Sequence, residues 1–333
     1  MVTEEKNSPR RILVIRLQAM GDVVIMLPYI YDLRKQLPDS VQMDLLTRKE
    51  TESIPRGLNL FNRVYALGGR RNTKLQFAYF FTLLPILLLN RYQLILDLQN
   101  NRLSSAIRFF LGVSKFVLFD RVSPIFAGDR YKNTIHKAGD WKVEYRSLCS
   151  LKFSMEERLL EKFGLKAQKY IILNPGGFFT NRNWPIENYL LFCKLWEKQV
   201  SEDQVFLMLG TEKIFEKECQ LKPQLGAKLV SIISQTNPFE AFLLVKNALL
   251  TISEDSGLLH FSYTSGTPTI GILGSTRSDW TNPLLPHTFF FHSSDLPCGN
   301  CMLAECKFSE PHCITRVSAE EVVQQSKTLL HIS

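Results

Sequence analysis

Long hydrophobic runs are missing from this sequence of 333 residues. Its most apolar stretch, residues 77–89, has 13 residues and contains Pro85, whereas a membrane-spanning helix needs roughly 20 residues. A buried helix and a helix that lies on a membrane surface both fit this stretch. Residues 1–10 are polar and lack the apolar centre of a secretory signal. We therefore expect a cytoplasmic protein that is soluble or peripheral at the cytoplasmic membrane face.

Dense runs of Lys and Arg with interleaved aromatic residues are also missing, which argues against a nucleic-acid-binding protein. The chain nevertheless carries a net charge of +8 at pH 7. This excess fits a phosphorylated substrate or an acidic membrane face as the partner, and it fits an ordinary solvated surface equally well. The charge alone leaves these interpretations open.

Cysteine is scarce except near the C-terminal end, where four of the seven cysteines lie: Cys298, Cys301, Cys306 and Cys313. Because no export signal is expected, a disulfide framework is disfavoured. The C-x2-C spacing at the start of this cluster fits a structural zinc site, but the C-x6-C spacing at its end is looser than usual. Reduced, packed thiols and a metal site are the two alternatives.

Strand and helix signals alternate along two stretches of the chain. The apolar runs that predict strands lie at residues 11–17, 41–46, 63–67, 92–98 and 115–119, and again at 170–173, 204–209, 249–252 and 269–273. Helical spacing of apolar residues predicts the main helices at residues 22–37, 186–198, 213–220, 239–247, 257–264 and 318–330. This alternation predicts an α/β architecture in which parallel sheets carry helices on both faces.

The two stretches predict two Rossmann-like domains. Residues 120–138 look irregular, and helical patterns at 139–151 and 155–163 follow before the alternation restarts. We place the boundary near residue 165, which gives an N-terminal domain of residues 1–165 and a C-terminal domain of residues 166–333. Two such halves usually bind a ligand in the cleft between them, at the carboxyl ends of the strands.

Asp22 is the first candidate site residue. Residues 16–22 (RLQAMGD) follow the first predicted strand and lead through Gly21 into a helix. A carboxylate at a helix N-terminus often serves as a cap that stabilises the helix. It can also act as a general base toward a hydroxyl group, and the helix dipole favours its ionised form. Position alone does not separate the cap from the base.

Residues 173–185 contain a second candidate site. A predicted strand is followed by Pro-Gly-Gly at 175–177, where exposed backbone N–H groups can cradle an anion. Arg182 follows, and a guanidinium can clamp a phosphate through two parallel hydrogen bonds. The dinucleotide fingerprint G-x-G-x-x-G and the Walker loop are both absent. An ordinary loop and a phosphate site are the two interpretations.

A third candidate site lies at residues 252–260 (ISEDSGLLH), where a predicted strand ends in an acidic turn and a helix begins. The N–H groups of Ser256 and Gly257 at the helix N-terminus are suited to a diphosphate. Asp255 is suited to a hydrogen bond with protein groups or with a ligand hydroxyl. His260 lies about one turn into the helix, where a histidine is either packed or functional.

The order of these segments resembles glycosyltransferase family 9, the ADP-heptose:lipopolysaccharide heptosyltransferases, over about residues 11–325. Residues 11–37 are similar to the family's opening segment, with Arg-Leu, then Gly-Asp, then Leu-Pro within the helix. Residues 92–100 (YQLILDLQN) resemble its second N-terminal signature. Residues 174–185 (NPGGFFTNRNWP) are similar to its Pro-Gly and basic-x-Trp-Pro elements, and residues 255–260 (DSGLLH) to its Asp-Thr-Gly-x-x-His element.

The resemblance implies a GT-B fold, in which an N-terminal acceptor domain and a C-terminal donor domain place their parallel sheets on either side of a central cleft. It implies transfer of a sugar, heptose in this family, from a nucleotide-diphosphate donor such as ADP-heptose to an anionic glycolipid such as the lipopolysaccharide core. Peripheral contact with the inner membrane follows from such an acceptor. No metal or other cofactor is expected, since a basic side chain and a helix N-terminus neutralise the leaving diphosphate.

The resemblance also implies roles for individual residues. Asp22 takes the place of the general base, and Gly21 and Asn100 lie on the acceptor side. The positions that match the donor site are Gly176, Arg182, Glu212, Asp255, Ser256, Gly257 and His260. Arg182 stands where the family commonly has a lysine, which keeps the charge and changes the geometry. Glu212 matches, more loosely, an acidic contact to the donor ribose.

Two other functions remain open. A related sugar-nucleotide epimerase shares the two-domain architecture but not the Gly-Asp exit from the first strand. A non-catalytic nucleotide- or glycan-binding protein would keep the binding motifs without turnover. The sequence does not name the base or the sugar of the donor, the acceptor or the oligomeric state.

Overall fold

The computed structural model describes residues 9–70 and 72–332, and the chain divides into two compact units, Met1–Arg146 and Ser147–Ser333. The predictions made for residues 1–10 fall almost wholly outside the described residues. The division lies earlier in the chain than the predicted boundary near residue 165. The intervening segment packs with the second unit, where the Glu156 carboxylate accepts hydrogen bonds of 2.9 and 3.0 Å from Lys246 Nζ.

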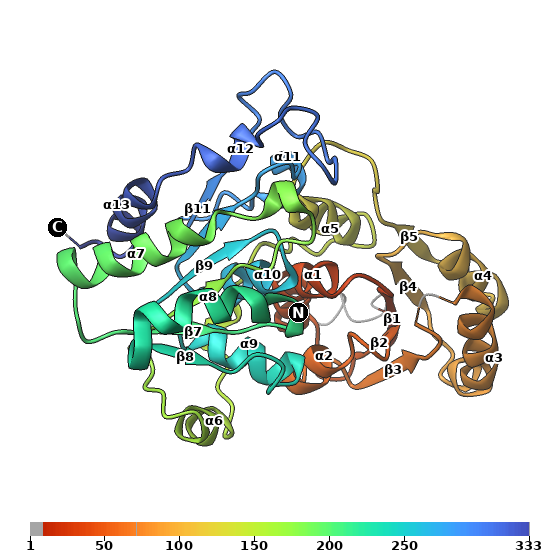
Figure 1. Cartoon of the computed structure of the whole chain (residues 1–333). Helices are drawn as coiled ribbons and strands as arrows, with labels where there is room; N and C mark the ends of the chain where they lie inside the picture. The colour runs from red at the N-terminus through yellow and green to blue at the C-terminus, as the bar shows by residue number, and fades with distance from the viewer. Residues whose placement is uncertain (1–8, 71, 333) are drawn as a thin grey trace. The chain divides into compact units, whose positions relative to one another are not determined.

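The first unit is built on a parallel sheet of five strands among the described residues. Its elements in chain order are β1 (Arg11–Ile15), α1 (Met20–Gln36), β2 (Gln42–Arg48), α2 (Ser53–Leu58), β3 (Arg63–Leu67), α3 (Thr73–Leu89), β4 (Leu94–Asp97), α4 (Arg102–Leu111), β5 (Phe116–Leu118) and α5 (Ala127–His136). The strand order is β3-β2-β1-β4-β5 (Figure 1). The order reverses between β1 and β4, which is the topological switch point where open α/β sheets bind ligands.

The second unit repeats this architecture with six parallel strands in the part of the chain that is described. Its strands and longer helices are α6 (Glu156–Lys162), β6 (Tyr170–Asn174), α7 (Ile186–Gln199), β7 (Val205–Met208), α8 (Phe215–Leu225), β8 (Leu229–Ser231), α9 (Pro238–Lys246), β9 (Leu250–Glu254), α10 (Gly257–Ser265), β10 (Thr269–Ile272), β11 (Thr288–Phe291) and α13 (Ala319–Leu329). Its short helical turns are η1 (Leu148–Ser150), η2 (Thr180–Arg182), η3 (Glu212–Ile214), η4 (Gly226–Lys228), α11 (Ser278–Thr281) and α12 (His312–Thr315). The order β11-β10-β9-β6-β7-β8 puts its switch point between β6 and β9.

Central strands form where the sequence is apolar on both faces. β1 (RILVI) is buried after its first residue, and β6 (YIILN) is buried throughout. Helices cover both faces of a parallel sheet, so its strands are continuous apolar runs rather than alternating ones. The core of the second unit adds large aromatic side chains, among them Trp184 and Trp196, which are almost fully buried. The predicted α/β fold with two Rossmann-like parallel sheets is confirmed.

Two local predictions are wrong. Residues 120–138, predicted to be irregular, contain α5, which packs on α1. Residues 139–151, predicted to be helical, are irregular apart from η1. Asp32 of α1 holds this segment, because its buried carboxylate accepts a hydrogen bond from the Glu144 backbone N–H at 3.0 Å and pairs with Arg146 at 2.6 Å. The short strands β8 and β11 were not predicted.

Helix α3 is apolar on nearly every side, but only one side is buried. Phe80 and Leu87 are fully buried in the core of the first unit, whereas Leu89 is 80% exposed. The buried-helix interpretation therefore holds for one side of α3 only. None of the helices in the described ranges is both long and apolar enough to cross a membrane.

Because only one side of α3 is buried, replacing two leucines of this helix should have different effects on the free energy of unfolding. Leu87→Ala leaves a cavity in the core and should lower the free energy of unfolding by about 2–5 kcal/mol. Leu89→Ala, the matched control, should change it by less than about 0.5 kcal/mol. Urea unfolding followed by circular dichroism measures both. Equal losses would contradict the packing of α3.

Candidate functional site

Asp22 lies at the carboxyl end of β1, in the first turn of α1. Ala19 occupies the N-cap position that was one interpretation for Asp22, but the Asp22 side chain caps the helix from the third helical position in a capping box, so its capping role is confirmed. Its Oδ2 atom accepts a hydrogen bond from the Ala19 backbone N–H at 2.9 Å and pairs with Arg16 Nη2 at 2.7 Å. The side chain remains 40% exposed. One carboxylate oxygen is thus fixed by the protein while the group still faces solvent.

Arg16 is the buried partner that orients Asp22. Its Nη1 atom donates to the Leu98 carbonyl at 2.6 Å, and its guanidinium lies 5.4 Å from the Phe119 ring centre and 5.5 Å from that of Tyr131. The Tyr131 hydroxyl donates to the Asp22 carbonyl at 3.1 Å. A guanidinium between two aromatic rings and a carbonyl has little freedom to move. The Arg16–Asp22 pair is therefore a preorganised group.

The loop after β4 supports the same turn. Gln99 Oε1 accepts hydrogen bonds from the backbone N–H groups of Leu17 and Gln18 at 2.9 and 3.1 Å. The fully buried Asp97 carboxylate accepts from the N–H groups of Gln99 and Asn100 at 3.1 and 2.7 Å, and pairs with Arg108 at 2.8 Å. The segment that resembles the family's second signature therefore holds the Asp22 turn in place.

The two predicted acceptor-side residues, Gly21 and Asn100, both have structural contacts. Gly21 is buried in the first turn of α1. Asn100 donates from Nδ2 to the Phe119 carbonyl at 2.9 Å, which ties the end of β4 to the end of β5. Its backbone N–H is held by Asp97. Both residues shape the switch point of the first unit.

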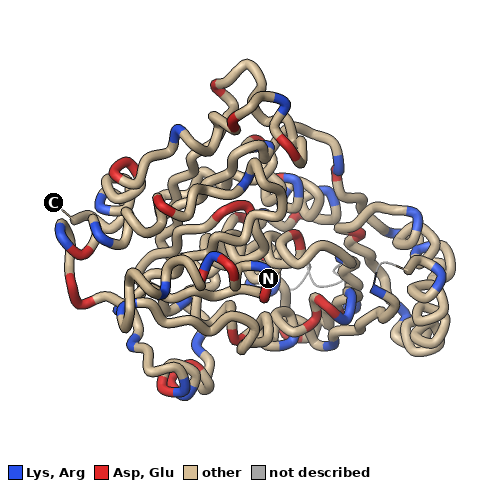
Figure 2. The backbone as a smooth tube through the Cα atoms, in the orientation of Figure 1, with Lys and Arg blue, Asp and Glu red and all other residues tan. Residues whose placement is uncertain are grey.

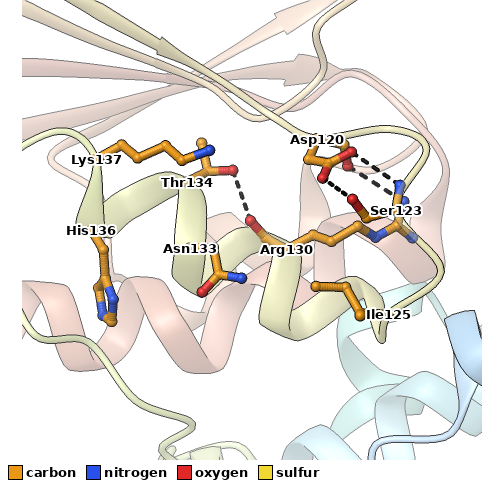
Figure 3. Close-up of a pocket in the computed structure, with 8 residues that line it drawn as sticks. All are labelled: Asp120, Ser123, Ile125, Arg130, Asn133, Thr134, His136 and Lys137. Atoms are coloured by element: carbon orange, nitrogen blue, oxygen red, sulfur yellow. Dashed lines mark hydrogen bonds between the residues drawn. The ribbon is translucent and has the colours of Figure 1, made fainter.

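A cavity of about 430 Å³ opens beside α5 in the first unit. Figure 3 shows its lining, which carries three basic side chains and one carboxylate: Arg130, His136 and Lys137 with Asp120. Hydrogen bonds from Ser123 Oγ and from the backbone N–H groups of Val122 and Ser123 lower the pKa of Asp120 to about 2. Lys137 is exposed at the rim. The cavity is suited to an anionic group.

In the second unit, Asn174 and Ser256 join the two strands at the switch point. Asn174 ends β6, and its Nδ2 atom donates to Ser253 Oγ at 3.1 Å and to Ser256 Oγ at 2.6 Å. Ser256 is the N-cap of α10, and Gly257 is its first residue. The first N–H groups of a helix have no partner within the helix. The predicted diphosphate-binding N–H groups thus lie at the carboxyl edge of the sheet, beside β6.

Glu254, at the end of β9, is fully buried and was not among the predicted site residues. Its carboxylate accepts hydrogen bonds from the backbone N–H groups of Gly177 at 2.7 Å and Trp184 at 2.8 Å, and lies 3.4 Å from Lys217 Nζ. Burial raises the pKa of Glu254, and Lys217 with the two N–H groups opposes that rise. The prediction that the Gly177 N–H is exposed for an anion is therefore wrong.

Arg182 and Asp255, both predicted donor-site residues, form a partly buried ion pair. Arg182 Nη1 lies 2.8 Å from Asp255 Oδ2, and the same oxygen accepts a hydrogen bond from Thr276 Oγ1 at 2.6 Å. Arg182 Nε also donates to Ser275 Oγ at 3.3 Å. The guanidinium lies over the Phe179 ring at 4.7 Å. Asp255 and the ring therefore set the orientation of the guanidinium.

The remaining predicted donor-site residues lie around the same edge. His260, in the second turn of α10, contacts the Tyr263 hydroxyl through Nδ1 at 3.0 Å. Gly176 approaches Asn174 so closely that a side-chain Cβ would lie 2.5 Å from its Oδ1 atom. Glu212 is exposed in η3, in the loop after β7. Since β7 is the neighbour of β6, its loop leaves the same edge of the sheet.

The four C-terminal cysteines line one small hollow together with Ser275 and Ser293. All seven cysteines are free. Burial and the three neighbouring thiols raise the pKa of Cys313. Within the described ranges, no three His, Cys, Asp or Glu side chains are arranged to hold a metal ion. The four thiols therefore gather at one hollow, and packed thiols and a metal site both stay predictions.

Asn174, Lys217, Glu254 and Thr276 belong to the site but were not predicted as site residues. Glu254 lies within residues 252–260, but of the two acidic residues in that turn only Asp255 was predicted to belong to the site. A carboxylate at the end of an otherwise apolar strand is the signal that would have found it, since a buried charge needs partners. Lys217 lies in a helix with the apolar and polar spacing of an ordinary surface helix, so nothing in the sequence marked it as a site residue.

Comparison with known proteins points to one family. A sequence profile described as glycosyltransferase family 9 (heptosyltransferase) matches residues 82–312. The chain is 27% identical to lipopolysaccharide heptosyltransferase 1 of Campylobacter coli, over 80% of this chain and 85% of that protein.

Two solved structures are similar to the whole chain. E. coli ADP-heptose lps heptosyltransferase II has a TM-score of 0.76 at 16% identity and covers 96% of this chain and 98% of its own. A glycosyl transferase family 9 protein from Veillonella parvula DSM 2008 has a TM-score of 0.79 at 16% identity, with 97% of each chain covered. At these identities the likeness shows the fold, and the predicted GT-B type is confirmed.

The contacts of Glu254 predict that it is essential for stability. Glu254→Ala leaves two backbone N–H groups and the Lys217 ammonium without their acceptor, and should cost about 3–5 kcal/mol of unfolding free energy. Glu212→Ala, at an exposed carboxylate in the same unit, should cost less than about 0.5 kcal/mol. Chemical unfolding measures both, and a Glu254 variant as stable as the Glu212 control would refute the assignment.

Proposed function

The chain belongs to glycosyltransferase family 9, and from this premise we propose that it transfers heptose from ADP-heptose to an anionic glycolipid of the lipopolysaccharide-core type. One observation carries the proposal. The segments that resemble the family's motifs lie at the topological switch points of the two sheets, β1/β4 and β6/β9. Open α/β sheets bind ligands at such points. The names of the relatives, which include ADP-heptose and lipopolysaccharide, support this donor and acceptor.

The donor diphosphate is assigned to the second unit. The N–H groups of Ser256 and Gly257, at the start of α10, would face its oxygens. Arg182, oriented by Asp255, would supply the positive charge that balances the departing diphosphate. Glu212, in the loop after the neighbouring strand, is placed to accept hydrogen bonds from the ribose hydroxyls. This arrangement needs no cofactor to neutralise the leaving group.

Asp22 is assigned as the general base. Its ion pair with Arg16 fixes one carboxylate oxygen, and its exposure leaves the group accessible to a hydroxyl. In the proposed reaction the acceptor oxygen forms a bond to the anomeric carbon of heptose, and the bond from that carbon to the β-phosphate oxygen breaks. The hydroxyl proton moves to Asp22, and ADP leaves with the bonding electron pair.

The acceptor is assigned to the first unit. The cavity beside α5 carries Arg130, His136 and Lys137, so it favours anionic substituents of a glycolipid. Tyr131 connects this helix to Asp22, because its hydroxyl donates to the Asp22 carbonyl. A bound acceptor would therefore lie close to the base.

Replacing Asp22 tests the role of the base. Asp22→Asn should lower kcat for heptose transfer by about 10²–10⁴-fold and leave binding of ADP unchanged. Asp140→Asn, at an exposed aspartate of the same unit, should keep wild-type kcat. Circular dichroism checks that both variants fold. Near-wild-type transfer by Asp22→Asn would remove the base assignment, and conversion of labelled donor without acceptor would favour the epimerase.

A thermal-shift series identifies the donor. A ligand that binds only the folded state raises Tm according to its concentration over its Kd. Saturating ADP-heptose should raise Tm by several degrees, while the matching GDP- and UDP-sugars should raise it much less. A larger shift with a GDP- or UDP-sugar would contradict the proposed donor and leave the transferase assignment intact.

A further inference from the structure

The first unit exposes an unusual apolar surface on α3 and α4, which we name the α3–α4 face. Its largest members are 41–80% exposed: Tyr79, Phe81, Ile86, Leu89, Phe109 and Phe110. The two helices contact each other, as Figure 1 also shows. Phe81 and Phe110 lie edge to face with ring centres 5.3 Å apart, which joins the helices into one surface. Contiguous exposed apolar surface of this kind marks an interaction site.

Packing within the unit does not account for this face. The opposite side of α3 already supplies Phe80 and Leu87 to the core. The exposed residues of α3 recur at a helical spacing, from Leu75 through Tyr79 and Ile86 to Leu89, so they form one continuous stripe. α3 has 17 residues and, like every described helix, does not meet the requirements for a membrane span. The stripe is therefore suited to lie on a surface rather than to cross it.

The charge around the face is almost entirely of one sign. Residues 70–119 contain seven Lys and Arg but only one acidic residue, Asp97, which is fully buried and paired with Arg108. This segment thus carries a net charge of +6 out of +8 for the whole chain. Figure 2 shows Lys and Arg, but no Asp or Glu, on α3 and α4. Lys74 and Arg102, which lie near the start of each helix, are exposed.

We propose that the α3–α4 face docks the enzyme on an anionic lipid surface. Apolar side chains that enter the interface and basic side chains that attract anionic headgroups act together in peripheral membrane binding. A second copy of the chain fits less well as the partner. A symmetric interface would bring the Lys and Arg residues around one α3–α4 face against the same residues of the other copy. The inference rests on the proposed function in one respect: a lipid-linked acceptor would be met at that surface.

Vesicle flotation with the full-length chain tests the apolar part of the proposal. Wild-type protein should bind phosphatidylglycerol/phosphatidylethanolamine vesicles and bind pure phosphatidylcholine vesicles at least about tenfold more weakly. The double variant Leu89→Ser/Phe109→Ser should lose most of this binding. The matched control Leu284→Ser/Phe308→Ser, at exposed apolar residues of the second unit, should bind like wild type. Equal losses in both variants would overturn the proposal.

Two lysine variants, one on the α3–α4 face and one in the second unit, test the electrostatic part of the proposal. Lys74→Glu should weaken binding to the anionic vesicles by about tenfold, and added salt should weaken wild-type binding as well. Lys166→Glu, at an exposed lysine of the second unit, should have little effect. Wild-type binding that is insensitive to lipid charge and salt would contradict the inference. So would a stable dimer that the Leu89→Ser/Phe109→Ser variant abolishes in sedimentation velocity.

These outcomes are independent of the proposed chemistry. The vesicles contain neither donor nor acceptor, so failure to bind them concerns only the α3–α4 face. Transfer to a water-soluble, delipidated acceptor should be the same in wild type and in Leu89→Ser/Phe109→Ser, while transfer to acceptor embedded in vesicles should fall in the variant. A loss of transfer to the soluble acceptor would show that the face belongs to the acceptor site and not to membrane docking.

Discussion

A fully buried carboxylate at the carboxyl edge of each sheet is the feature on which both candidate sites depend. Asp97 accepts hydrogen bonds from two backbone N–H groups and forms an ion pair with Arg108. Glu254 accepts hydrogen bonds from the backbone N–H groups of Gly177 and Trp184 and contacts Lys217. A buried charge persists only when hydrogen-bonded and paired in this way. Each carboxylate thereby fixes the loops that leave the strands at its switch point.

The groups assigned to chemistry are attached to these fixed loops. In the first unit, Gln99 holds the turn that presents Asp22, and Gln99 is itself held through Asp97. In the second unit, the loop held by Glu254 leads to Arg182, which is then oriented by Asp255. A base and a cation whose geometry is set before the substrate arrives need little reorganisation free energy to reach the transition state. The supporting carboxylates are therefore positioning residues, and Asp22 and Arg182 are the proposed catalytic ones.

Much of the fold was predictable because central parallel strands are buried on both faces and stand out as apolar runs. β8 and β11 were missed because they are short strands at sheet edges. The false helix at 139–151 arose because its apolar spacing fits a helix, while Asp32, more than a hundred residues earlier, holds the segment in an irregular conformation. The segments that carry Asp22, Arg182 and Asp255 were predictable as motifs. The ion pair between Arg182 and Asp255 was not predictable, because the two residues are 73 positions apart in the sequence.

The central claim is that the nucleotide binds at the β6/β9 switch point of the second unit. Hydrogen–deuterium exchange of the wild-type chain, with and without saturating ADP, tests it without any substitution. The account predicts slower exchange at residues 255–260 and 174–184 on addition of ADP, with residues 16–22 of the first unit unchanged. Protection confined to the first unit, with the second unit unaffected by bound ADP, would contradict it.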